Sequence, residues 1–140
     1  MKKYLLLLTV TLFLASCTTN PQDTRRKITV TIEPLRYFTE QIAGDKFAVN
    51  TMVPQGGNPE TYEPTTQQMV KLAESDLYIK VGNIGFERTW MKKLSQNAPH
   101  TIIIDSSEGI DLAPSSHGVS DPHTWMSTNN AKQIARNIYQ

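Results

Sequence analysis

The sequence predicts an α/β fold: a Rossmann-like, parallel four-stranded sheet with helices on both faces. Two observations support this prediction. Short segments rich in β-branched residues alternate with amphipathic segments of helical periodicity, in the order β-α-β-α-β-α-β-α. Glycine and proline mark many of the boundaries between these segments. A repeated strand-then-helix order favours a parallel sheet that is covered on both sides.

The first strand and helix have the clearest patterns. Apolar residues alternate with threonines over 28–32, which indicates a strand. Pro34 suits the first turn of a helix, where its missing N–H costs nothing, and Gly44 ends that helix. The apolar face of this helix is expected to hold Leu35, Phe38 and Ile42.

The middle of the chain repeats this arrangement. Alternation over 47–53 predicts a second strand, which the Pro54-Gln55-Gly56-Gly57 segment ends. Thr65 or Thr66 is a suitable cap for the next helix, and a third strand is expected over 77–81. The inner face of this helix is expected to hold Met69, Leu72 and Ala73.

The last elements are a helix over 86–98, a strand over 101–104 and a helix that one of the polar residues 127–129 caps. The final helical pattern reaches Gln140 without a stop signal, so we expect the chain to stop inside a helix. The buried faces of these two helices are expected to hold Trp90, Met91 and Leu94, and Ala131, Ile134, Ala135 and Ile138, respectively.

The amino terminus has the layout of a bacterial lipoprotein signal. Two lysines precede an apolar run over 4–14, and small residues followed by Cys17 close it. At about 1.5 Å per residue, this run is too short for the ~30 Å core of a bilayer. The resemblance implies a signal peptide over 1–16, a lipid on Cys17 and a flexible tether over 17–26. A short signal anchor that is never cleaved is the alternative.

The composition excludes several classes of function. Cys17 is the only cysteine, so no intrachain disulfide can form. Without Lys2 and Lys3, 12 Lys and Arg residues stand against 13 Asp and Glu residues. This balance offers no electrostatic footprint for nucleic acid. We therefore expect a domain that acyl chains hold at the membrane and that has no nucleic-acid partner.

Two long loops follow the second and fourth predicted strands, where ligands bind in open parallel sheets. The first loop contains Glu60 after Pro59, and the second contains His123 after Pro122. Carboxylate oxygen and imidazole nitrogen are ligands for zinc, manganese or ferrous iron. Each residue also has a simpler interpretation, Glu60 as a solvated loop carboxylate and His123 as a histidine bonded to backbone.

Other polar residues are weaker candidates for a functional site. We expect His117 to be solvated and His100 to be structural, since it precedes a strand at the opposite edge. Glu87, near a helix start, suits the helix dipole. Asp105 ends a strand and is a fair position for a general base, although the sequence shows no partner for it. No glycine-rich loop followed by lysine and no nucleophile elbow is present.

Several motifs together resemble one family, the metal-binding solute-binding lipoproteins of zinc and manganese ABC importers. The resemblance covers residues 28–140. It is carried by Ile32-Glu33-Pro34-Leu35-Arg36-Tyr37-Phe38, Gly57-Asn58-Pro59-Glu60-Thr61-Tyr62-Glu63-Pro64-Thr65, Ala73-Glu74-Ser75-Asp76-Leu77, Gly85-Phe86-Glu87 with Trp90, and Asp121-Pro122-His123-Thr124-Trp125.

The resemblance implies a receptor with two Rossmann-like lobes, joined by a rigid helix, that hold a metal ion between them. Residues 27–126 would form the first lobe, and 127–140 would begin the linking helix. Glu60 and His123 would supply the first-lobe ligands for zinc, manganese or iron, with no organic cofactor. The implied partner is the permease of an ABC importer, and the implied location is the bacterial cell envelope, outside the cytoplasm, as a lipid-anchored monomer.

The sequence departs from the family pattern in two places. Glu60 stands where most of the family has a histidine, which makes the site harder and favours manganese or ferrous iron over zinc. The loop before His123 holds one histidine, His117, where many zinc receptors have several. The alternatives are an adhesin or structural lipoprotein of the same fold, a truncated and non-functional receptor, or a metal-dependent hydrolase with Asp105 as its base. The receptor interpretation predicts no enzymatic activity.

Overall fold

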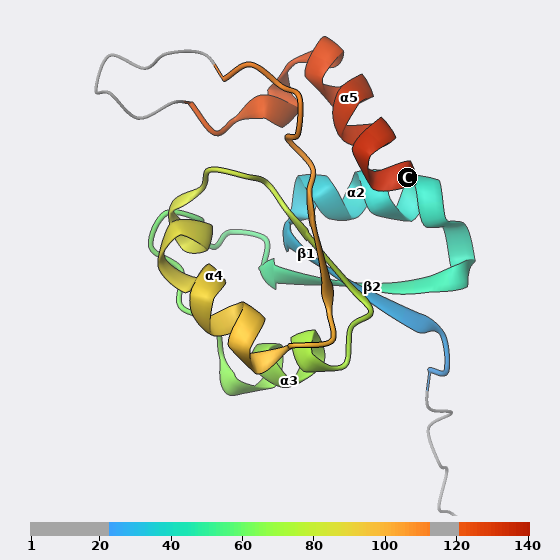
Figure 1. The fold of residues 1–140 in the computed structure, drawn as a ribbon, viewed down its shortest axis with the longest axis vertical. Coiled ribbons are helices and arrows are strands. Elements are labelled where there is room, and N and C mark those ends of the chain that lie inside the picture. The colour runs from blue at the N-terminus through green and yellow to red at the C-terminus, as the bar shows by residue number, and fades with distance from the viewer. Residues whose placement is uncertain (1–22, 113–120) are drawn as a thin grey trace, which may run out of the picture.

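The computed structural model describes residues 23–112 and 121–140 and contains a four-stranded parallel sheet in the order β2-β1-β3-β4. Figure 1 shows the sheet between two helical layers, with α2 and α5 on one face and α3 and α4 on the other. The strands are β1 (Arg26–Ile32), β2 (Phe47–Val53), β3 (Leu77–Lys80) and β4 (Ile102–Asp105). The helices are α2 (Glu33–Ala43), α3 (Thr66–Ala73), α4 (Gly85–Asn97) and α5 (Thr128–Tyr139), with 3₁₀ turns η1 (Gly44–Lys46) and η2 (Thr124–Met126).

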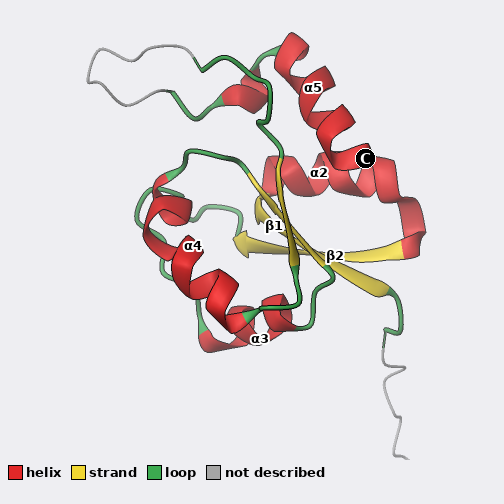
Figure 2. Ribbon diagram, in the orientation of Figure 1, coloured by secondary structure: helices red, strands yellow, loops and turns green. Residues whose placement is uncertain are grey.

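The predicted fold class is therefore confirmed, and the elements follow the sequence patterns closely (Figure 2). Pro34 lies in the first turn of α2, and Gly44 ends that helix at a positive φ of 60°. Thr65 caps α3 through a complete capping box with Gln68. Ser127 is the N-cap residue of α5, although its side chain makes no capping hydrogen bond.

The hydrophobic core lies on both faces of the sheet. Central β1 is almost fully buried, as expected for a strand with neighbours on both sides. Leu72, Leu94 and Ile134 are the buried anchors of α3, α4 and α5. The expected inner position of Ala73 is wrong. This last residue of α3 is exposed, since the short helix buries only one side chain.

Cys17 and the predicted signal and tether up to residue 22 lie outside the described residues, as does His117. Among the residues that the structure does describe, no helix is both long enough and apolar enough to cross a bilayer.

Candidate metal site

The Glu60 loop leaves the carboxyl end of β2 through a tight turn. Gly57 N–H donates to the Pro54 carbonyl at 2.9 Å, and Gly56 has a positive φ of 83°, which only glycine adopts readily. Asn58 shapes the next turn, since its side-chain oxygen accepts from Glu60 N–H at 2.9 Å. These local bonds fix the backbone of Glu60 and leave its side chain at the surface.

The loop then rests on the first turn of α4. Phe86 N–H donates to the Pro59 carbonyl at 2.8 Å. Gly85 has no room for a side chain, because a Cβ there would lie 2.6 Å from the Glu60 carbonyl oxygen and 2.8 Å from Glu60 Cα. This backbone contact places the Glu60 carboxylate at a helix amino terminus, where negative charge is favoured. Its Oε2 accepts a hydrogen bond from Arg88 Nη2 at 2.9 Å.

His123 lies in the second loop, just before η2, and Asp121 holds its ring. Asp121 Oδ1 is 2.6 Å from His123 Nδ1 and also accepts from the His123 backbone N–H at 2.9 Å. The backbone N–H and the ring of His123 together hold the pKa of Asp121 below its usual value. A carboxylate on one ring nitrogen is the arrangement that orients metal-binding histidines, and it leaves Nε2 for a ligand.

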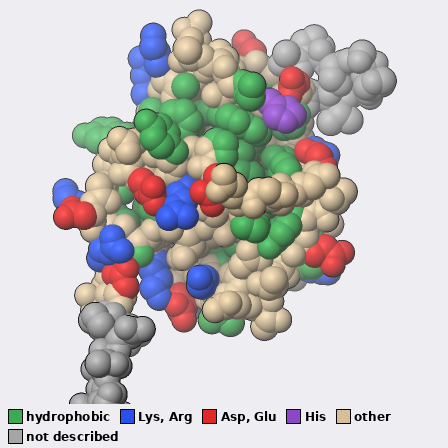
Figure 3. All heavy atoms as spheres, turned by 180° about the vertical axis from the view of Figure 1, so that it is seen from behind, with side chains coloured by type: hydrophobic (Ala, Val, Ile, Leu, Met, Phe, Trp, Pro, Cys, Tyr) green, Lys and Arg blue, Asp and Glu red, His purple; other side chains and the backbone are tan. Residues whose placement is uncertain are grey.

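The two loops meet at one edge of the sheet. A hollow of about 230 Å³ lies beyond the ends of β1 and β2, and its lining includes Pro59 and Trp125. Pro59 and Trp125 lie close in sequence to Glu60 and His123, respectively. The centroids of the Trp125 and His123 rings are 5.2 Å apart. In Figure 3, hydrophobic side chains gather over the upper part of the visible face, next to a histidine. The expected placement of both loops at the carboxyl edge of the strands is thus observed.

The two candidate ligand side chains have separate partners within this arrangement. Glu60 pairs with Arg88, whereas His123 pairs with Asp121 and lines its own hollow of about 320 Å³ beside Asp111 and Asn130. Within residues 23–112 and 121–140, no group of three or more His, Cys, Asp or Glu residues is positioned to hold a metal ion. The convergence of Glu60 and His123 on one ion stays a prediction.

Glu87 is a buried carboxylate in the first turn of α4, the turn that the Glu60 loop contacts. Its side chain is only 3% exposed, and it accepts hydrogen bonds from Thr31 Oγ1 at 2.5 Å, Val81 N–H at 2.6 Å and Gly82 N–H at 2.8 Å. Burial raises the pKa of Glu87, although these three bonds act in the opposite direction. Glu87 thereby ties the end of β3 to the first turn of α4, on which the Glu60 loop rests. Sequence reasoning placed Glu87 near a helix start but missed its burial.

Of the remaining candidate residues, Asp105 is bound by neighbouring side chains and His100 lies far from the two loops. Lys80 Nζ is 2.5 Å from Asp105 Oδ2, and Ser107 donates two further bonds to Asp105 Oδ1. Burial acts to raise the pKa of Asp105, but the bonds from Lys80 and Ser107 outweigh it and leave the pKa below its usual value. The sequence shows no partner for Asp105, and the structure supplies Lys80 and Ser107; a carboxylate whose pKa is lowered in this way is a weak general base. His100 is exposed just before β4, at the opposite edge, as expected.

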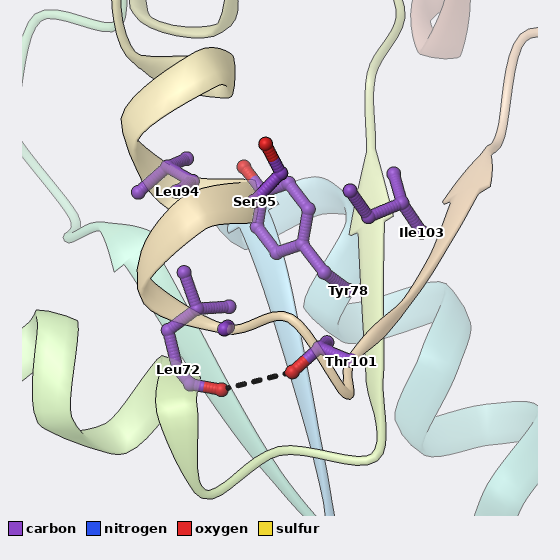
Figure 4. A pocket seen from close by; sticks show the side chains of 7 residues that line it. Leu72, Tyr78, Leu94, Ser95, Thr101 and Ile103 are labelled. Atoms are coloured by element: carbon purple, nitrogen blue, oxygen red, sulfur yellow. Dashed lines mark hydrogen bonds between the residues drawn. The ribbon is translucent and has the colours of Figure 1, made fainter.

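A further cavity lies at that opposite edge and is too small for a substrate. Figure 4 shows it between α3, α4 and the strands β3 and β4, where Thr101 Oγ1 donates to the Leu72 carbonyl at 3.4 Å. Its volume is about 10 Å³, which is room for about one water molecule.

Comparison with known proteins finds relatives among the substrate-binding proteins of metal ABC transporters. The family model "Zinc-uptake complex component A periplasmic" (ZnuA) matches residues 28–140. The manganese ABC transporter substrate-binding lipoprotein PsaA of Streptococcus pneumoniae is 32% identical over 91% of this chain and 45% of its own length. The high-affinity zinc uptake system protein ZnuA of Bacillus subtilis is 29% identical over 79% of this chain and 39% of its own length.

Solved structures of metal-binding proteins are also similar to this chain in fold and in sequence. A crystal structure of ZnuA superimposes with a TM-score of 0.77 at 39% identity and covers 81% of this chain and 44% of that one. The chain therefore spans less than half the length of the relatives that it matches.

Proposed function

The chain belongs to the zinc-uptake complex component A (ZnuA) family, and from this premise we propose that it forms the amino-terminal lobe of an extracytoplasmic receptor for a divalent transition metal. The receptor would deliver its ion to the permease of an ABC importer. The observation that carries the proposal is the family match over residues 28–140, and the same residues include the two loops, with Glu60 and His123, that meet at one edge of the sheet.

We propose Glu60 and His123 as the first-lobe ligands of this ion. Their side chains are the oxygen and nitrogen donors that zinc, manganese and ferrous iron accept. Both are about half exposed, so an ion could reach them from solvent. The carboxylate of Asp121 supports the assignment of His123, because it engages Nδ1 and so makes Nε2 the ring nitrogen that is left for an ion.

The proposed preference among metals follows from the ligand type. Glu60 contributes oxygen where a histidine would contribute nitrogen, so it makes the site harder and more anionic. Harder sites favour manganese and ferrous iron relative to zinc.

The proposed domain organisation is a lobe over 27–126 followed by the start of a linking helix over 127–140. The packing of α5 against α2 and the burial of Ile134 on α5 support a firm connection between this helix and the lobe. We further propose that residues 1–16 are a signal peptide, that Cys17 carries lipid and that 17–26 are a tether. The mature receptor would then be a membrane-tethered monomer in the cell envelope.

A receptor function involves no bond making or breaking, so we propose that the protein is not an enzyme. The state of Asp105 supports this view, since the one carboxylate considered as a hydrolytic base is held by Lys80 and Ser107.

The proposal is tested by titrating the full-length gene product with Mn²⁺ and Zn²⁺ and comparing single alanine variants. Glu60→Ala and His123→Ala should each weaken metal binding at least about tenfold, since loss of a mere outer-shell partner of a ligand already costs about 10–100-fold. Glu63→Ala, in the same loop, and His100→Ala, at the opposite edge, serve as matched controls and should bind as the wild type does. Unchanged affinity in both ligand variants would refute the assignment.

A further inference from the structure

Arg88 occupies one oxygen of the proposed ligand Glu60. Its Nη2 donates to Glu60 Oε2 at 2.9 Å, while its Nη1 donates to the Asn83 carbonyl at 2.8 Å. The guanidinium therefore bridges the turn before α4 and the Glu60 loop. Arginine stays protonated at all physiological pH values and accepts no hydrogen bond, so its interaction with the carboxylate is always that of a cation.

A backbone contact holds the Glu60 loop against the helix that carries Arg88. Phe86 N–H holds the Pro59 carbonyl at 2.8 Å, and the absence of a side chain at Gly85 lets the loop approach to this distance. Arg88 follows one turn later on the same helix. The backbone of Glu60 is thus held beside the first turn of α4, so a metal ion that approaches the carboxylate also approaches the Arg88 guanidinium.

We propose that Arg88 is an internal counter-ion that lowers the affinity of the site by competing with the metal for Glu60. The inference rests on the proposed function, because it requires Glu60 to be a ligand. Two effects act in the same direction. A bidentate carboxylate needs Oε2, so the metal must displace Arg88 Nη2 or bind through Oε1 alone. The positive charge of Arg88 also repels a divalent cation bound a few ångströms away.

Removing Arg88 should leave the fold intact. Arg88 and Glu60 side chains are 47% and 45% exposed, and ion pairs with that exposure contribute little to stability. Arg36 offers a matched control on α2, since its Nε donates to Glu40 Oε1 at 2.8 Å and its side chain is 44% exposed. Arg36→Gln removes the same charge from a similar ion pair that does not involve Glu60.

The experiment is a Mn²⁺ titration of the full-length gene product, with free Mn²⁺ followed by electron paramagnetic resonance. Arg88→Gln should raise the affinity about tenfold at low salt, and Arg88→Lys, which keeps the charge but loses the planar fork, should raise it less. The gain should shrink at 1 M salt, where charges are screened within about 3 Å. Arg36→Gln should stay within about twofold of the wild type.

A double variant distinguishes failure of the ligand role of Glu60 from failure of the counter-ion role of Arg88. Glu60→Gln should bind weakly, and adding Arg88→Gln to it should raise the affinity by less than the same change does in the wild type, because only charge repulsion, and no competition for a carboxylate, is then relieved. If the wild type binds no Mn²⁺, or if Glu60→Gln binds as tightly as the wild type, the proposed function of Glu60 and this inference both fail. If Glu60→Gln weakens binding but Arg88→Gln leaves it unchanged or weaker, only the counter-ion role of Arg88 is overturned.

Discussion

Gly85 is the residue on which the position of Glu60 depends most. A Cβ at this position would collide with the backbone of Glu60, with the carbonyl oxygen 2.6 Å away, and backbone atoms cannot yield as a flexible side chain can. The hydrogen bond from Phe86 N–H to the Pro59 carbonyl depends on the same close approach.

We therefore predict that Gly85→Ala destabilises the fold by about 1–3 kcal/mol, as overpacking does, and also weakens metal binding. Thr89→Ala, at an exposed position of the same helix, is the control and should change neither property. Urea denaturation and Mn²⁺ titration measure the two effects. A Gly85→Ala protein with wild-type stability and affinity would show that the loop does not rest on α4 in solution.

Glu87 makes stability depend on pH, because burial raises its pKa above the unfolded value of about 4.3. A raised pKa means that the folded state binds the proton more tightly than the unfolded state does. The stabilisation that Glu87 provides relative to glutamine is then complete below pH 4 and is lost as the pH rises through the folded pKa.

We predict that the difference in unfolding free energy between the wild type and Glu87→Gln falls as the pH rises from 4, by roughly 1.4 kcal/mol for each unit of pKa shift. Chemical denaturation at several pH values measures it, with the exposed Glu108→Gln as a flat reference. If the difference instead grew with pH, the donors Thr31, Val81 and Gly82 would outweigh burial and the carboxylate would be the favoured form.

At the scale of an element, α3 closes the Glu60 loop. Thr65 accepts a hydrogen bond from Gln68 N–H at 3.3 Å, and Gln68 accepts one from Thr65 N–H at 2.8 Å. The Gln68 side chain also reaches back to donate to the Met52 carbonyl at 2.7 Å, at the end of β2. The capping box therefore fixes both ends of the loop relative to each other.

Thr65→Ala should lower stability by about 1 kcal/mol, the usual effect of losing a helix cap. The neighbouring Thr66→Ala should change stability by less than about 0.5 kcal/mol, since Thr66 is exposed within the helix. Thermal or urea unfolding distinguishes the two. Equal losses in both variants would mean that Thr65 does not act as the cap.

The elements themselves were predictable because each has a local signal. Alternation marked β1 and β2, Pro34 and Gly44 marked the limits of α2, and the two threonines marked the start of α3. β1 begins at Arg26, two residues before the expected start and inside the predicted tether, and the limits of the other elements also differ by one or two residues, as helix and strand ends commonly do. Ala73 was misplaced because helical periodicity alone does not say how wide the buried face of a short helix is.

At the scale of the whole molecule, the parallel sheet brings together the two loops that the sequence marks as candidate sites. Their shared edge follows from topology, since the carboxyl ends of parallel strands lie on one side. The details of the site could not be predicted in the same way. Arg88 is 28 residues from Glu60, and Glu87 is 56 residues from Thr31, so only the folded chain brings these pairs together. The hydrogen bonds from Asp121 to His123 were also missed, although the two residues are only two positions apart and a local turn could have indicated them.

In the proposed receptor, Glu60 and His123 bind one and the same metal ion. Anomalous diffraction at the zinc absorption edge, from crystals of the full-length gene product grown with Zn²⁺, tests it most directly. A single anomalous peak is expected about 2.0–2.2 Å from both a carboxylate oxygen of Glu60 and Nε2 of His123. A peak that contacts neither residue, or separate peaks at each, would contradict it.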